Sequence, residues 1–206
     1  MIKLNDNVDP RTVESMRFCP PWRPHSGPAI TGLLHLMDDV YQFNDASNYG
    51  LRVLELGTHC GESTLLIASH SYVDSVDTVD RHRYAPAMHR LAELVRSELV
   101  SIHVDEFFDF MAACEDESYD LVYIDGDHDY NSVFRDLRSA ERLIPAGGMI
   151  AGHDYADNFP GVQRALHDYL EEHESQGPPD KQAWNWVRTY CDNSFLLKKG
   201  PVLHDE

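Results

Sequence analysis

A short apolar segment that runs directly into a glycine-rich turn is the feature that most constrains the fold of this chain. Residues 51–56 form an apolar run that contains one acid, Glu55, and a turn with Gly57 and Gly61 follows. An apolar pattern at helical spacing begins at once, near residue 62. This order of strand, glycine turn and helix is typical of the first unit of a nucleotide-type binding sheet.

The spacing of the glycines narrows the class of ligand. The dinucleotide fingerprint is G-x-G-x-x-G, and its third glycine lets the helix pack closely on the strand. Here the pattern from Glu55 to Gly61 is E-x-G-x-x-x-G, which disfavours NAD and FAD. A glutamate just before the turn suits a ligand that carries a cation, such as an amino group.

Strand and helix patterns alternate along the rest of the chain. The expected strands lie at about 51–56, 73–79, 100–104, 121–124 and 149–151, and the expected helices near 30–41, 62–70, 88–99, 107–111, 133–144 and 162–170. This alternation predicts an α/β, Rossmann-like, doubly wound sheet, mostly parallel, with helices on both faces. Apolar residues at 186–187 and 195–197 predict a closing hairpin that adds an antiparallel strand.

Length and composition indicate one domain that spans residues 1–206. We expect a catalytic core at 50–200 and, at 1–45, a loop and helix that serve as a lid or an oligomer contact. The net charge of -18 argues against nucleic acid or an anionic membrane as main partner and favours a small-molecule substrate, although a host with an acidic proteome would give the same charge balance. The sequence shows neither a signal peptide nor an apolar run long enough for a membrane span, so a cytoplasmic location is expected.

Polar residues after the first three expected strands form a candidate nucleotide site. After the first strand they are Glu55, Gly57, Thr58, His59, Gly61 and Ser63, although Ser63 could equally be a helix-capping residue. A carboxylate at the end of the second strand could accept hydrogen bonds from both hydroxyls of a ribose. Asp80 and Asp77 both qualify, and Asp80 is preferred because it lies 19 positions after Gly61. Asp105, after the third strand, could meet an adenine amino group or cap a helix.

Two clusters of acids and histidines follow the next two strands. Asp125, Asp127, His128 and Asp129 lie within five residues, whereas helix capping needs only one of them. The pair His153-Asp154 follows the adjacent expected strand. Neighbouring parallel strands would bring Asp125 and this pair together, as a divalent metal site or as a metal-free electrostatic cradle.

Taken together, these segments resemble the class I S-adenosylmethionine-dependent methyltransferases, in particular a small bacterial O-methyltransferase-like group. The resemblance is carried by Ile124-Asp125-Gly126-Asp127-His128-Asp129-Tyr130, by Gly152-His153-Asp154-Tyr155 and by Pro160-Gly161-Val162-Gln163-Arg164-Ala165. It implies a seven-stranded sheet with a reversed last strand. It also implies that S-adenosylmethionine contacts the candidate nucleotide site, including Asp80 and Asp105, and Asp125 where the fourth strand ends.

The resemblance further implies a divalent metal held by Asp125, His153 and Asp154. The histidine departs from the all-acid pattern of related magnesium enzymes, and imidazole suits manganese or other transition metals better than Mg²⁺. Metal identity and metal dependence therefore stay open at this point.

The expected reaction is O-methylation of a small-molecule hydroxyl, with His128 or Asp127 as the base that removes its proton. His128 is preferred because its ordinary pKa lies near neutrality. Two alternatives remain: a domain that binds S-adenosylmethionine without catalysis, and a metal-dependent hydrolase that uses the acid and histidine clusters. A homo-oligomer is a further possibility.

Overall fold

A computed structural model describes residues 27–44, 50–176 and 184–200 of the chain. The expected irregular lead-in before residue 27, and with it much of the expected lid, lies outside the described residues. The described helix of that region is α2 (Gly27–Phe43), where apolar residues recur at helical spacing.

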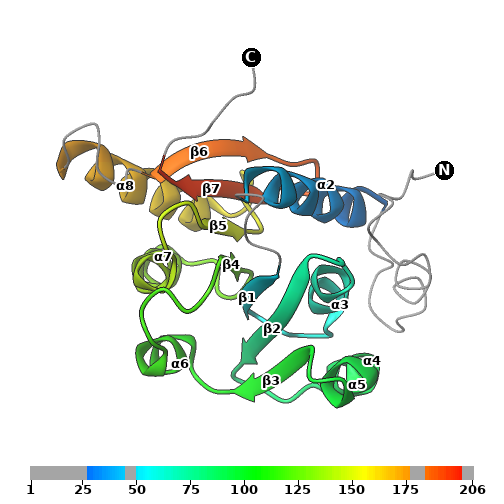
Figure 1. Cartoon of the computed structure of the whole chain (residues 1–206). Coiled ribbons are helices and arrows are strands. Elements are labelled where there is room, and N and C mark those ends of the chain that lie inside the picture. Colours follow the sequence, from blue (N-terminus) through cyan, green and yellow to red (C-terminus); the bar gives the residue numbers. More distant parts are fainter. Residues whose placement is uncertain (1–26, 45–49, 177–183, 201–206) are drawn as a thin grey trace.

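Seven strands form one sheet in the order β3-β2-β1-β4-β5-β7-β6 (Figure 1). Their bounds are β1 Leu51–Leu56, β2 Val73–Asp80, β3 Val100–Val104, β4 Leu121–Ile124, β5 Met149–Gly152, β6 Trp184–Thr189 and β7 Phe195–Lys199. The first five strands are parallel, and β7 is antiparallel to both β5 and β6. The expected doubly wound sheet and its closing hairpin are therefore confirmed.

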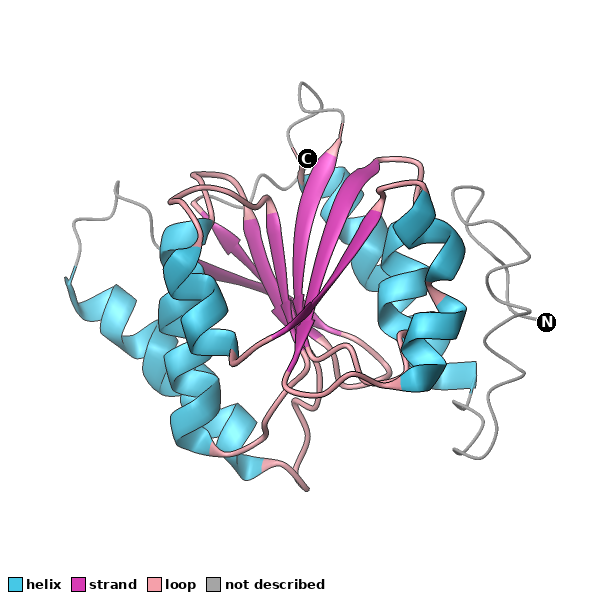
Figure 2. Cartoon of the chain, turned by 90° about the horizontal axis from the view of Figure 1, so that it is seen from below, coloured by secondary structure: helices cyan, strands magenta, loops and turns pink. Residues whose placement is uncertain are grey.

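The remaining helices connect these strands and cover both faces of the sheet (Figure 2). Their bounds are α3 Glu62–Ala68, α4 Ala85–Arg90, α5 Ala92–Arg96, α6 Phe107–Ala113, α7 Tyr130–Leu143 and α8 Pro160–Gln176. One apolar core packs α2 and α3 on one face, and a second packs α6, α7 and α8 on the other. All four residues of β4 are buried, as a strand covered on both faces requires.

The connection between β2 and β3 differs from the single helix expected over residues 88–99. It consists of α4 and α5, which meet at Leu91 with φ near -91° and ψ near 1°. Leu91 is fully buried in the core at this break. Leu99 lies beyond α5, just before β3.

The strand order places the functional edge of the sheet. The chain goes outward from β1 to β2 and β3, then returns to β4 on the other side of β1. Ligands of such sheets bind at the carboxyl ends of the strands, next to this reversal. None of the described helices is long and apolar enough to cross a membrane.

Candidate active site

One cavity of about 480 Å³ opens at the carboxyl edge of the sheet. Its wall contains the turn after β1, the end of β2 and the loops that follow β4 and β5. Segments that are well separated in sequence thus meet in one space, as the alternating pattern predicts.

The turn after β1 needs its two glycines for different reasons. Gly57 has φ of +110°, and a Cβ added there would lie 2.1 Å from the carbonyl oxygen of Asp125. Only glycine allows the loops after β1 and β4 to approach so closely. Gly61 has φ of +72° at the N-cap of α3, and a Cβ there would press on the side chain of Leu91. Between these glycines, Thr58, His59 and Cys60 line the cavity.

Glu55 lies beneath this turn and does not belong to the cavity wall. Its carboxylate is fully buried and accepts hydrogen bonds from the hydroxyls of Ser63, Thr64 and Thr78. Burial raises the pKa of Glu55, although the three hydroxyls oppose the rise. Ser63 does line the cavity, and it binds Glu55 instead of capping α3. The structure thus places Glu55 as a support for the turn.

Asp80 and Asp77 occupy different surroundings. Asp80 lines the cavity, and its two oxygens accept hydrogen bonds from the backbone N–H of His59, at 2.9 Å, and of His82, at 3.1 Å. Asp77 is held by His103 and by the hydroxyl of Tyr119, and it does not line the cavity. The geometry favours Asp80 as the ribose residue.

The loop after β3 contributes less than expected. Asp105 is not on the cavity wall, and its side chain accepts from the backbone N–H of Glu106. The cavity is instead lined there by Phe107 and by Arg81, whose guanidinium lies 5.6 Å from the centre of that ring. Arg81 also pairs with Glu106 and Asp127, so it connects the loops after β2, β3 and β4.

Only one of the polar residues after β4 serves as a helix cap. Asp129 is the N-cap of α7 and accepts from the backbone N–H of Asn131 and Ser132. Hydrogen bonds from the side chain of Ser132 and from these two backbone groups hold the pKa of Asp129 below its ordinary value. Asp125 and His128 have no capping role, and both line the cavity.

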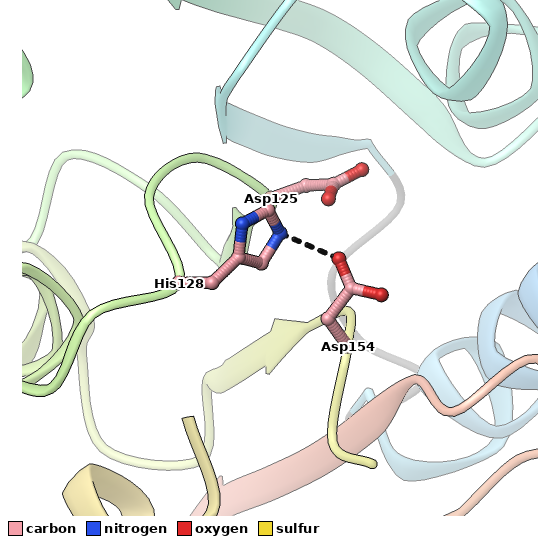
Figure 3. Close-up of side chains that lie close together, drawn as sticks. All are labelled: Asp125, His128 and Asp154. Atoms are coloured by element: carbon pink, nitrogen blue, oxygen red, sulfur yellow. Dashed lines mark hydrogen bonds and ion pairs between the residues drawn. The ribbon is translucent and has the colours of Figure 1, made fainter. Parts of the chain in front are cut away.

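An acid–imidazole cluster forms where β4 and β5 end (Figure 3). Nε2 of His128 lies 2.6 Å from Oδ2 of Asp154, and the His128 ring stacks on Phe159. Nδ1 of His153 lies 3.1 Å from Oδ1 of Asp154 and 3.9 Å from Oδ1 of Asp125. Ligand atoms of Asp125, His128 and Asp154 lie within 4.8 Å of one another. Among the described residues, the three-residue group with metal-ligand spacing thus contains His128 where the resemblance implied His153.

The pKa values of Asp125, His153 and Asp154 are shifted in different directions or by different causes. Burial raises the pKa of Asp125 to about 7. Burial acts to lower the pKa of His153, but its hydrogen bond to Asp154 and the charge of Asp125 outweigh it and raise this pKa to about 9. Burial likewise acts to raise the pKa of Asp154, yet hydrogen bonds and charges from His153 and His128 hold it below its ordinary value. Such perturbed groups in a cleft are typical of functional sites.

Some residues of the cavity wall were not predicted from the sequence. They are Leu33 of α2, Arg81 and Tyr84 after β2, Tyr123 of β4 and Asp192 in the turn between β6 and β7. Arg81 had a local signal, since it directly follows Asp80. Leu33 and Asp192 had none, because only the tertiary fold brings them to this edge.

Comparisons with known proteins agree with this arrangement. Residues 54–155 match the family model described as a methyltransferase domain. No curated protein matches the chain. A protein described as a caffeoyl-CoA O-methyltransferase from Staphylococcus aureus is 18% identical, with 82% of each chain covered and a TM-score of 0.58.

Two further solved structures show how widely this fold is used. An rRNA methylase from Streptococcus thermophilus is 12% identical, with 84% of this chain and 97% of that chain covered and a TM-score of 0.59. The N-methyltransferase NodS from Bradyrhizobium japonicum is 14% identical, with coverages of 82% and 96% and a TM-score of 0.53. At these identities the likeness concerns the fold alone, and proteins of this fold differ in what they methylate.

The matched segment, 54–155, contains the glycine turn, Asp80 and the acid–imidazole cluster, and the sheet around it is that of known methyltransferases. The resemblance seen in the sequence is confirmed: the chain is a class I S-adenosylmethionine-dependent methyltransferase.

Proposed function

We propose that this methyltransferase transfers the methyl group of S-adenosylmethionine to a hydroxyl oxygen of a small molecule. The observation that carries the proposal is a single cavity, lined at once by the glycine turn, by Asp80 and by the pair His128 and Asp154. Methyl transfer requires the sulfonium methyl and the acceptor oxygen to lie in line within one enclosed space. The turn and Asp80 would hold the cofactor, and the pair would face the acceptor.

The small-molecule acceptor is supported by charge. The chain has 35 acidic against 17 basic residues. The cavity wall also contains several acids, among them Asp125, Asp154 and Asp192. A nucleic-acid acceptor would require a basic surface to meet its phosphates. Although an rRNA methylase shares the fold, this balance favours a neutral or cationic small molecule.

His128 is the group best placed to remove the acceptor proton. Asp154 orients its ring through Nε2 and Phe159 fixes the plane of the ring, so Nδ1 can accept a proton if the Nε2 proton faces Asp154. Asp127, the alternative base, is occupied by the guanidinium of Arg81. A carboxylate paired with arginine is a weaker proton acceptor. These contacts support His128 as the base and Asp154 as the group that orients it.

A second candidate mechanism is favoured by the spacing of Asp125, His128 and Asp154. Two carboxylates and one imidazole within 4.8 Å fit a divalent transition metal such as Mn²⁺ better than Mg²⁺. An ion held by these three residues would supply Lewis acidity to the acceptor hydroxyl. His128 would then be a ligand and could not also be the base.

Calorimetric titration separates the two mechanisms. Purified protein is titrated with Mn²⁺ and with Mg²⁺ after treatment with a chelator, beside the variant Asp154→Ala. If His128 is the base, neither ion binds at micromolar concentration and chelation leaves turnover unchanged. Binding of about one ion per chain that Asp154→Ala abolishes would assign His128 to the metal and refute its role as base.

A further inference from the structure

The turn between β6 and β7 adds a further acid, Asp192, to the cavity wall that also contains His128 and Asp154. Phe195, the first residue of β7, pairs with Gly152 at the end of β5. The backbone N–H of Tyr155 donates to the carbonyl oxygen of Asn193 at 2.9 Å. Asp192 therefore lies next to the His153–Asp154 segment, and its side chain lines the same cavity.

The carboxylate of Asp192 is enclosed and only partly satisfied. The residue is 7% exposed, and its Oδ1 accepts from the backbone N–H of Ser194 at 2.9 Å. Oδ2 makes no hydrogen bond, and the carboxylate has no ion pair, within the described part of the chain. Gly32 of α2 covers it so closely that a Cβ there would lie 2.0 Å from Cγ of Asp192. The carboxylate thus lies in the cavity wall, packed against α2, with one hydrogen-bond donor for its two oxygens.

The charge of Asp192 helps to raise the pKa of His153, but no ion pair joins these two side chains in the described part of the chain. The two nearby histidines are already used, since His128 pairs with Asp154 and His153 lies between Asp125 and Asp154. A buried carboxylate is costly unless a cation or hydrogen-bond donors meet it. A ligand ammonium would meet both needs, whereas a carboxylate or phosphate in that position would be repelled.

We infer that Asp192 is a specificity residue that binds a protonated amine of the acceptor, so that the substrate is a small hydroxyl compound carrying an amino group. This inference rests on the proposed function and names the substrate class of the same site. Asp192 would bind the amine, and His128 would face the hydroxyl that receives the methyl group.

The test uses two matched sets of probes on the full chain saturated with S-adenosylhomocysteine. One set is dopamine, 4-ethylcatechol and 3,4-dihydroxyphenylacetate; the other is glucosamine, glucose and glucuronate. Binding is measured by calorimetry up to 10 mM probe. We expect the amine of at least one set to bind about 10- to 100-fold more tightly than its neutral analogue, and the acid to bind most weakly.

Variants connect the preference to Asp192. Asp192→Asn should remove the preference for the amine while leaving affinity for S-adenosylhomocysteine unchanged. Gly32→Ala, whose Cβ displaces the carboxylate, should do the same where it folds. Glu115→Gln removes the same charge from an exposed residue that is not on the cavity wall, and it should keep the preference.

The results of these titrations either support or overturn the role of Asp192 in binding an amine. No preference for an amine in either set, no binding by either amine, or a preference that survives Asp192→Asn would overturn the role of Asp192. An Asp192→Asn variant that loses divalent-ion binding would assign it to a metal instead. Failure of the wild-type chain to bind S-adenosylhomocysteine would count against the proposed function, and it is seen in the same titrations before any probe is added.

Discussion

Truncation of Asp80 tests where the cofactor lies. Each oxygen of Asp80 accepts one backbone N–H, from His59 or His82, and keeps a further lone pair for a ribose hydroxyl. A hydrogen bond to a charged group contributes about 1.5–3 kcal/mol, so the loss of two costs at least about 3 kcal/mol. Asp80→Ala should therefore weaken binding of S-adenosylhomocysteine by about 100-fold or more.

The chain offers a matched control for this experiment. Asp77→Ala makes the same truncation three residues earlier on β2, where the carboxylate faces His103 and Tyr119 and not the cavity. Affinity is measured by isothermal titration calorimetry, and circular dichroism confirms that both variants remain folded at the temperature used. The reasoning fails if Asp80→Ala loses less than about threefold in affinity, or if Asp77→Ala loses as much as Asp80→Ala.

Three further outcomes follow from the structure. His128→Ala should lower kcat by about 10²- to 10⁴-fold with unchanged affinity for S-adenosylhomocysteine, as steady-state kinetics and calorimetry can show; equal loss in both would indicate a structural role. Asp136 is buried with no hydrogen bond to either carboxylate oxygen, and burial raises its pKa to about 7. Because its pKa is higher in the folded state, the wild type loses stability as pH rises from about 4 through 7. In urea unfolding, Asp136→Asn should be more stable than the wild type by up to about 4 kcal/mol at pH 8, and this difference should vanish below pH 4. A difference that does not depend on pH would contradict this expectation. Gly57→Ala should abolish binding of S-adenosylhomocysteine, because its Cβ would meet the Asp125 carbonyl; wild-type affinity by calorimetry would refute the close approach.

Much of the fold could be predicted because its signals are local. β1 and β4 are short, mostly apolar runs, and β1 has the bounds that its sequence predicts. The break at Leu91 could not be predicted, because the apolar spacing continues across it. Periodicity therefore locates elements better than it locates interruptions within them.

The part of the candidate site that lies at the ends of strands could be predicted from the sequence. Asp80 ends β2, and Asp125 and Asp154 follow β4 and β5, so the rule for parallel sheets brings them to one edge. The inward orientation of Glu55 was not visible, because it depends on hydroxyls of α3 and β2 that meet only in the fold. Asp192 was missed for a similar reason, since it belongs to a turn that reaches the site only through pairing of β7 with β5.

The central claim is transfer of a methyl group to a hydroxyl oxygen in this cavity. The most direct measurement incubates the protein with S-adenosylmethionine and a panel of small hydroxyl compounds, and follows S-adenosylhomocysteine and product mass by mass spectrometry. We expect one methyl ether to form for each S-adenosylhomocysteine released, with formation greatly reduced in Asp80→Ala and His128→Ala. Methylation on nitrogen or carbon only, or product formation that both variants leave unchanged, would contradict it.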